Sequence, residues 1–201
     1  MRLLTRSYDE FSEYFNPNIE ETLEKYTSDI QGIGMLQEFK LLQTNSPATS
    51  PDVFARLEEN IKKLQERLND HYSPRADYYR LLMSHSYYEH HEDHPSIRSV
   101  LNETIQLLEE HPKLGSRDRN GVPFFHLASL ELRQMAFESA VDNASKAREM
   151  FYPKMINYFN AGALKIWAMI YAGKVEEVEE VFKQLAWFIE FPQSMHNVGI
   201  H

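Results

Sequence analysis

The chain of 201 residues contains no cysteine, few glycines and no run of basic residues. Without cysteine it forms no disulfide, and it offers no thiolate for catalysis or for binding zinc or an iron–sulfur cluster. Its 21 basic and 30 acidic side chains give a formal net charge of −9, which repels the phosphate backbone of a nucleic acid. We therefore expect no nucleic-acid partner, and the composition is compatible with a reducing compartment.

A long hydrophobic run is also absent. The most apolar segment, Met155 to Tyr171, is interrupted by Asn157, Asn160 and Lys165, short of the roughly 20 apolar residues that span a bilayer. The first residues, MRLLTRSYDEFSEYF, carry charges at short intervals and lack the apolar core of a secretory signal. We expect no membrane partner and a cytoplasmic location.

Proline preceded by a polar residue marks four expected helix starts, at Asn16-Pro17, Ser50-Pro51, Ser73-Pro74 and His94-Pro95. Apolar residues then recur with a period near 3.6, and no segment shows the alternation of a strand, so the fold class is all-α. The expected helices span residues 3–15, 18–43 (where Gly32 and Gly34 could bend or break the helix), 51–69, 74–91, 95–110, 121–135, 137–151, 154–172 and 174–189.

We expect a single helical-repeat domain over residues 1–201, with irregular N-terminal helices in 1–49, weak hairpins in 51–111, the best hairpins in 121–189 and a tail in 190–201. Residues 51–69 combine apolar spacings of three and four with dense charge. They fit either an intramolecular helix with one solvated face or a self-association seam, which leaves a homo-oligomer open.

Small residues in the stretch from Phe124 to Pro153 indicate closely packed helices. Ala128, Ala140, Ala144 and Ala147 stand where two helix backbones must approach, and large apolar residues follow beside them. The large residues expected in the adjacent grooves are Phe124, Leu127, Phe137 and Val141.

This stretch resembles a tetratricopeptide repeat (TPR), with Leu127-Ala128 in its first helix, Phe137, Ala140 and Ala147 in its second, and Pro153 after it. The second helix recurs 38 residues later, where Phe137, Ala140 and Ala147 correspond to Val175, Val178 and Leu185, and Gly173 is expected to end the preceding helix. The first helix recurs poorly, and the period exceeds the usual 34 residues. The resemblance implies stacked antiparallel helical hairpins in a TPR-like right-handed α-α superhelix, with another α-α superhelix or a bundle as the alternative.

In such stacks the first helix of each hairpin lines a concave groove, so the resemblance also implies a set of binding residues. We expect Arg133 to supply charge, Asn160 to hydrogen-bond a bound backbone, and Trp167 or Tyr171 to anchor an apolar side chain. The alternative is that Trp167 and Tyr171 are core residues, because their helix is apolar nearly all round. The residues expected on the groove are Phe125, Ser129, Leu132, Arg133, Asn160, Ala163, Trp167, Ile170 and Tyr171.

The densest group of metal-ligand residue types runs from His85 to His94. Imidazole and carboxylate bind zinc, nickel or iron, so this group is a candidate metal site. A solvated turn between helices is the simpler interpretation, because His94 precedes Pro95 and is expected to cap the next helix. The group comprises His85, His90, His91, Glu92, Asp93 and His94.

No catalytic motif is present, since the chain lacks a glycine-rich phosphate loop and a nucleophile elbow. We expect a non-enzymatic scaffold or regulatory module that binds a protein or peptide partner in a concave helical groove, with no cofactor and no metal. A related alternative resembles bacterial TPR-type sensors of short signalling peptides. Two further alternatives are a metal-dependent helical enzyme using the group His85–His94, and a structural protein that self-associates through residues 51–69 or its final hairpin.

Overall fold

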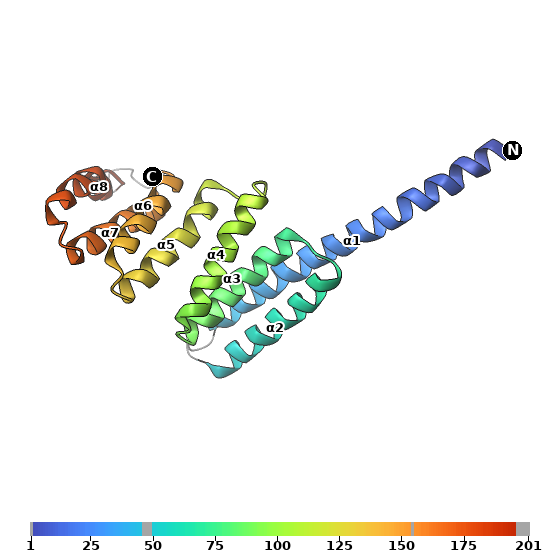
Figure 1. Cartoon of the computed structure of the whole chain (residues 1–201), viewed down its shortest axis with the longest axis horizontal. Coiled ribbons are helices and arrows are strands. Elements are labelled where there is room, and N and C mark those ends of the chain that lie inside the picture. Colours follow the sequence, from blue (N-terminus) through green and yellow to red (C-terminus); the bar gives the residue numbers. More distant parts are fainter. Residues whose placement is uncertain (1, 46–49, 154, 196–201) are drawn as a thin grey trace, which may run out of the picture. The chain divides into compact units, whose positions relative to one another are not determined.

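The structure, a computed structural model, describes residues 2–45, 50–153 and 155–195, and side chains within 18–44, 50–153 and 155–185. These residues form eight helices and no strand, which confirms the all-α class. The chain divides into two compact units, Met1–Val100 and Leu101–His201. The helices, labelled in Figure 1, are α1 (Arg2–Asn45), α2 (Pro51–Asp70), α3 (Pro74–His90), α4 (His94–Glu110), α5 (Arg117–Arg133), α6 (Phe137–Met150), α7 (Ile156–Tyr171) and α8 (Val175–Met195).

The N-terminal segment forms one continuous helix where the sequence predicted two. Pro17 lies inside α1, so the predicted helix start at Asn16-Pro17 is wrong, as is a break at Gly32 and Gly34. A proline within a helix removes one amide donor, and the 44-residue helix α1 runs through it without a break. Gly32 allows α1 to pack closely against α3, because a Cβ there would stand 3.0 Å from Cδ2 of Tyr79.

Several other helix ends differ from the predicted ones. Helix α5 begins four residues early because Ser116 caps it, its hydroxyl accepting from the amide of Arg119 at 3.2 Å. Helix α4 is capped by Asp93, whose carboxylate accepts from the amide of Ser96 at 3.2 Å, so the predicted cap His94 is the first helical residue. Helix α8 continues to Met195, which corrects the tail predicted for 190–201, while 196–201 lie outside the described residues.

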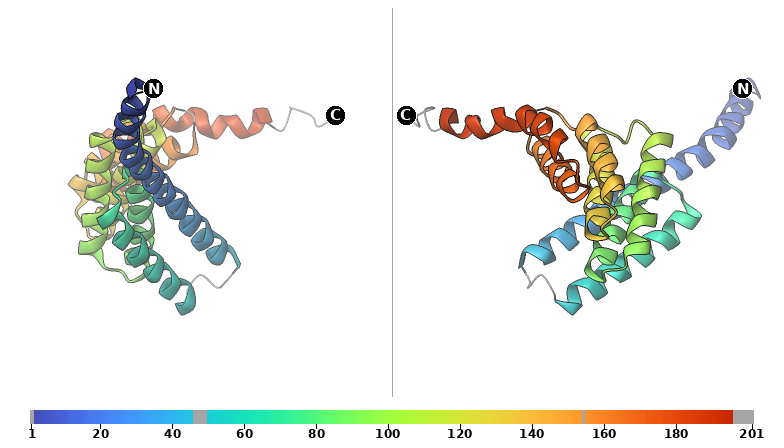
Figure 2. Two further views of the ribbon diagram at one scale, coloured as in Figure 1. Left: turned by 90° about the vertical axis from the view of Figure 1, so that its right-hand side faces the viewer. Right: turned by 60° about the vertical axis from the view of Figure 1, so that its left-hand side comes forward.

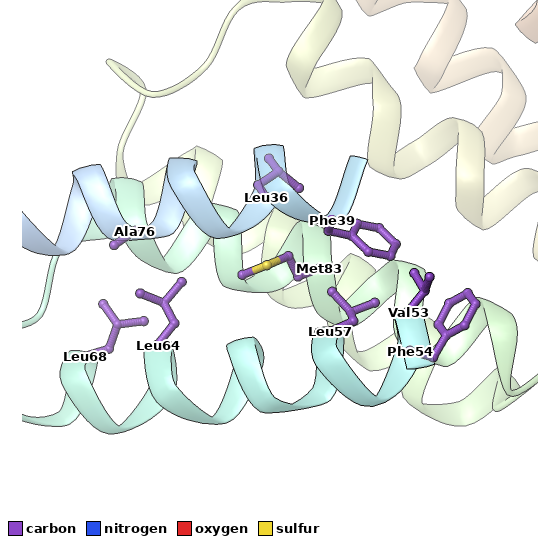
Figure 3. Packing of buried hydrophobic residues seen from close by; sticks show 9 residues of the cluster. All are labelled: Leu36, Phe39, Val53, Phe54, Leu57, Leu64, Leu68, Ala76 and Met83. Carbon is purple, nitrogen blue, oxygen red and sulfur yellow. The ribbon is translucent and has the colours of Figure 1, made fainter. Parts of the chain in front are cut away.

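The first unit has its core where α1, α2 and α3 pack together (Figure 3). Leu57, Leu64 and Met83 at its centre are at most 1% exposed. Arg67 of α2 ties this core to α1, donating to the hydroxyl of Ser28 at 3.0 Å and to a carboxylate. The apolar stripe of α2 is therefore used inside the unit, which favours the intramolecular interpretation of residues 51–69.

The second unit is built on the predicted alanines. Ala128, Ala140, Ala144 and Ala147 are all 0% exposed, as expected for residues between closely packed helices. Helix α6 packs against α5 and α7, α7 packs against α8, and α5 also touches α7. Figures 1 and 2 show α5, α6 and α7 lying side by side.

Three helices end in the same hydrogen-bonded turn, in which the middle residue has a positive φ: Glu92 after α3 (53°), Met135 after α5 (60°) and Gly173 after α7 (76°). This left-handed C-terminal turn satisfies the last carbonyls of a helix and reverses the chain within three residues. The predicted helix end at Gly173 is confirmed. After α5, the amides of Gln134, Met135 and Ala136 donate to the carbonyls of Leu130, Leu132 and Glu131, respectively. After α7, the amides of Ala172, Gly173 and Lys174 donate in the same way to Ala168, Ile170 and Met169. After α3, the amides of His91, Glu92 and Asp93 donate to Tyr87, Glu89 and Tyr88.

Candidate functional site

Helix α7 presents an exposed apolar face. Trp167 is 56% and Tyr171 is 59% exposed, so the alternative that they are core residues is wrong. Their helix buries its opposite side through Ala161, Ala168 and Met169, which are at most 2% exposed. Of the other predicted groove residues, Phe125 and Ser129 on α5 are half-buried, while Arg133 and Asn160 are exposed.

Two of these residues join a third aromatic ring to form what we call the aromatic patch: Phe137, Trp167 and Tyr171. The ring of Tyr171 stacks on Phe137, with centroids 5.4 Å apart, and on Trp167, with centroids 6.3 Å apart. Phe137 is the first residue of α6, and the sequence assigned it to helix packing. The patch therefore joins the start of α6 to the end of α7.

A small pocket opens between the first halves of α5 and α7. Its volume is about 150 Å³, which suits one inserted side chain and is below the range of small-molecule sites. It unites Phe125 and Asn160 from the predicted set, whereas Trp167 lies two helical turns further along α7. Sequence reasoning missed two polar residues of this pocket, which is lined by Val122, Phe125, His126, Phe151, Asn157 and Asn160.

A second and larger pocket, of about 430 Å³, is lined by basic residues, and we call it the cationic pocket. Arg148 is only 9% exposed, and its Nη2 donates to the hydroxyl of Tyr158 at 2.6 Å and to Oε1 of Gln184 at 2.8 Å. Its Nε has no hydrogen-bond acceptor. The lining residues are Arg117, Ser145, Arg148, Glu149, Tyr158, Lys165 and Gln184.

Lys165 is the second cation held inside this pocket. Burial lowers the pKa of its ammonium group, and the positive charge of Arg148 lowers that pKa further. Arg117, in contrast, uses its guanidinium to bind the carbonyls of Glu149 and Met150, each at 3.0 Å. Neither Arg148 nor Lys165 has an ion pair within the described part of the chain. The sequence signalled the pocket only through Lys165, a charge in an otherwise apolar helix.

The histidine-rich segment forms ring contacts around the end of α3. His90 stacks on Phe54 with centroids 3.4 Å apart and planes 4° apart, and His91 packs against Tyr87 at 4.4 Å. Nε2 of His85 lies 3.7 Å from a carboxylate oxygen of Glu89 on the same helix. Across the residues whose placement is described, no three histidine or carboxylate side chains gather closely enough to ligate a metal ion.

None of the helices, within the residues described, has the length and hydrophobicity required to cross a bilayer. Compared with known proteins, the chain matches no family model, and no curated protein or solved structure is significantly similar to it. A functional assignment therefore depends on the surfaces themselves.

Proposed function

We propose that residues 117–195 form a TPR-like stack of helical hairpins and that the protein is a non-enzymatic module that binds a peptide segment of a partner protein. Two observations support the stack. Its alanines are fully buried between helices, and the turns at Met135 and Gly173 share their three hydrogen bonds at the 38-residue offset seen in the sequence.

The observation that carries the binding function is the exposure of Trp167 and Tyr171 in the aromatic patch. Large aromatic side chains left more than half exposed on a rigid helix are typical of binding hot spots, because they lose little conformational entropy when a partner covers them. Here the stacking between Tyr171 and its two neighbours holds the rings in place before a partner arrives.

The preferred partner segment follows from what lies beside the patch. An apolar side chain of the peptide packs on Trp167, and a second side chain enters the α5–α7 pocket near Asn160. Seven residues separate these two positions on α7, about 10 Å along the helix axis. Arg133 at the end of α5 favours an acidic residue in the peptide. We therefore expect a short segment with two apolar anchors about 10 Å apart and a nearby acidic residue.

A peptide library displayed on phage tests this proposal directly. Peptides selected against the full chain are titrated against the wild type, Trp167→Ala, Arg133→Ala and the control Phe182→Ala, whose side chain is 52% exposed on α8. Loss of a hot-spot aromatic costs about 2 kcal/mol, so Trp167→Ala should weaken binding about 30-fold. Arg133→Ala should weaken it several-fold, with the effect fading at high salt.

Equal binding to the wild type and to Trp167→Ala would contradict the proposed groove. So would an equal loss for Phe182→Ala, because that result places the contact on α8. The metal-dependent enzyme remains a hypothesis that no contact of the described residues favours.

A further inference from the structure

We propose that the cationic pocket is a binding site for a small molecule that carries an oxyanion group, such as a phosphate or a carboxylate. This site is independent of the peptide groove. Lys165 lies about 140° around α7 from Asn160, so the two sites use different sides of that helix. Failure of one proposal would leave the other standing.

The argument begins with the cost of the charges in the pocket. Arg148 has lost nine tenths of its exposure to water, and its two contacts through Nη2 are with neutral groups, the hydroxyl of Tyr158 and the amide oxygen of Gln184. A buried guanidinium is normally paired with a carboxylate. Its Nε is buried without an acceptor, so the fold leaves this cation without an anionic partner, and the side chain lines the pocket where a ligand would supply one.

Lys165 adds a second cation that would gain from the same ligand. Arg148 and Lys165 repel each other, which is one reason why the pKa of Lys165 is lowered. An oxyanion between them would receive charge-assisted hydrogen bonds from both. Among the described lining residues Glu149 is the one carboxylate, so cations outnumber anions three to one in the lining, and the more distant carboxylates of Glu177 and Asp142 offset Lys165 less than its burial and Arg148 do.

The volume indicates more than a bare ion. A cavity of about 430 Å³ falls within the range of sites for small organic molecules. The ring of Tyr158, whose centroid lies 4.6 Å from the guanidinium carbon of Arg148, belongs to the same lining and adds aromatic surface beside the cations. We therefore expect a compact organic body attached to the anionic group.

Isothermal titration of the full chain with inorganic phosphate and with succinate, at constant ionic strength, tests this site. The two probes distinguish a phosphate from a carboxylate ligand. We expect at least one to bind, and Lys165→Met to weaken it at least tenfold, because the substitution keeps the length of the side chain and removes the charge. Lys183→Met, which removes an exposed lysine of α8, is the matched control and should bind as the wild type does.

If neither probe binds at concentrations up to about 50 mM, the proposal is overturned. It is also overturned if both lysine variants weaken binding equally, because that result reflects general charge screening. Lys165→Met gives a second, ligand-free readout. It removes a half-buried charge, so it should raise the urea midpoint of the second unit. If Lys165 instead stabilised the fold, its removal would lower that midpoint and contradict the proposal.

A different observation carries a second inference, on the first unit. Helix α1 is apolar on two opposite faces. One face is buried against α2 and α3 through residues such as Leu36 and Phe39. The other face, which we call the α1 stripe, is exposed by between 39% and 64%, and it consists of Ile19, Leu23, Tyr26, Ile30, Ile33 and Leu41. From Ile19 to Ile33 the spacing alternates four and three, the heptad pattern of paired helices.

We infer that the α1 stripe pairs with the stripe of a second copy of this chain in antiparallel orientation. A two-fold axis at Ile30 places Ile19 of one copy opposite Leu41 of the other, so the two stripes overlap along their full length, whereas a parallel pair would set the two large rings of Tyr26 against each other. The same axis places Tyr26 opposite Gly34, where even a Cβ would meet no atom within 4 Å, so the large ring has room.

The area is sufficient for a specific but moderate interface. The stripe exposes on the order of 600 Å² per copy, so a pair would bury about 1,200 Å², the lower end of the range for stable complexes. We expect a dimer whose population depends on concentration. Ile30→Glu should keep the chain monomeric because it buries two like charges at the axis, and the neighbouring exposed Gln31→Glu is the matched control.

Analytical ultracentrifugation from about 1 to about 300 μM measures this equilibrium. Orientation is tested by oxidative cross-linking, which has no background because the chain has no cysteine. A mixture of Ile19→Cys and Leu41→Cys should give disulfide-linked dimers, and Ile19→Cys alone should give none. A chain that stays monomeric, a dimer that survives Ile30→Glu, or cross-linking of Ile19→Cys with itself would overturn the inference.

Discussion

Replacing Gly121 by alanine should destabilise the second unit, although the same exchange in an open helix is stabilising. An alanine Cβ at this position of α5 would stand 2.7 and 2.9 Å from two ring carbons of Phe151 and 3.1 Å from the carbonyl oxygen of Ala147. The ring is 1% exposed and has little room to turn. The carbonyl is fixed because it accepts from the amide of Phe151 at 3.0 Å.

The magnitude follows from two opposing effects. Alanine is about 1 kcal/mol more favourable than glycine within a helix. Overpacking a rigid contact costs up to about 3 kcal/mol. The net expectation is a loss of about 2 kcal/mol from the free energy of unfolding, which corresponds to a fall of about 1 M in the urea midpoint.

Tryptophan fluorescence is the appropriate assay, because both tryptophans, Trp167 and Trp187, lie in the second unit. Gly34→Ala in α1 is the control, followed by circular dichroism because the first unit contains no tryptophan. It meets no atom within 4 Å, and it should raise the stability of the first unit by about 1 kcal/mol at a protein concentration too low for self-association. Phe151→Leu should partly relieve Gly121→Ala, so the double variant should lose less than the sum of the two single losses. A rise in the midpoint for Gly121→Ala would refute the close approach of α5 and α6.

The other predictions concern the shared turns and the cap of α4. Met135→Gly should raise the urea midpoint of the second unit by the equivalent of about 1 kcal/mol, because glycine adopts the φ of 60° without strain, and Gly173→Ala at the corresponding turn should lower it by a similar amount. If both substitutions shifted the urea midpoint in the same direction, this reasoning would be contradicted. The hydrogen bonds from Ser96 hold the pKa of Asp93 below its usual value, so the stabilisation from this carboxylate is present above the unfolded-state pKa and is lost as the pH falls through the lowered one. Circular dichroism of the wild type and of Asp93→Asn should therefore show a difference in pH dependence only below about pH 4.

The sequence predicted those parts of the fold that depend on local pattern. Buried alanines such as Ala140 and Ala147 could be predicted because a small residue at helical spacing has few uses other than close packing. The turn at Gly173 could be predicted from its residue type, while Met135 and Glu92 adopt the same conformation without any such signal. Pro17 misled the helix assignment, since a proline can begin a helix or lie within one.

The candidate sites were harder to predict from the sequence than the fold, for two physical reasons. Helix α7 is apolar nearly all round, so periodicity could not decide whether Trp167 faced solvent or the core. The cationic pocket joins Arg148, Tyr158 and Gln184 from three helices, and no fixed spacing connects such residues. Only Lys165, a charge within an apolar segment, indicated a polar site on this helix.

The left-handed turn residues have a consequence for how such a chain can change over time. A glutamate, a methionine and a glycine occupy equivalent positions after α3, α5 and α7, and Met135 is 76% exposed. Because the side chain there points away from the packed helices, almost any residue type is tolerated for a modest conformational cost. Hairpins of this kind can therefore diverge beyond sequence recognition at their tips while the backbone path stays the same, so comparison of hydrogen-bonding patterns would find distant relatives that residue identity overlooks.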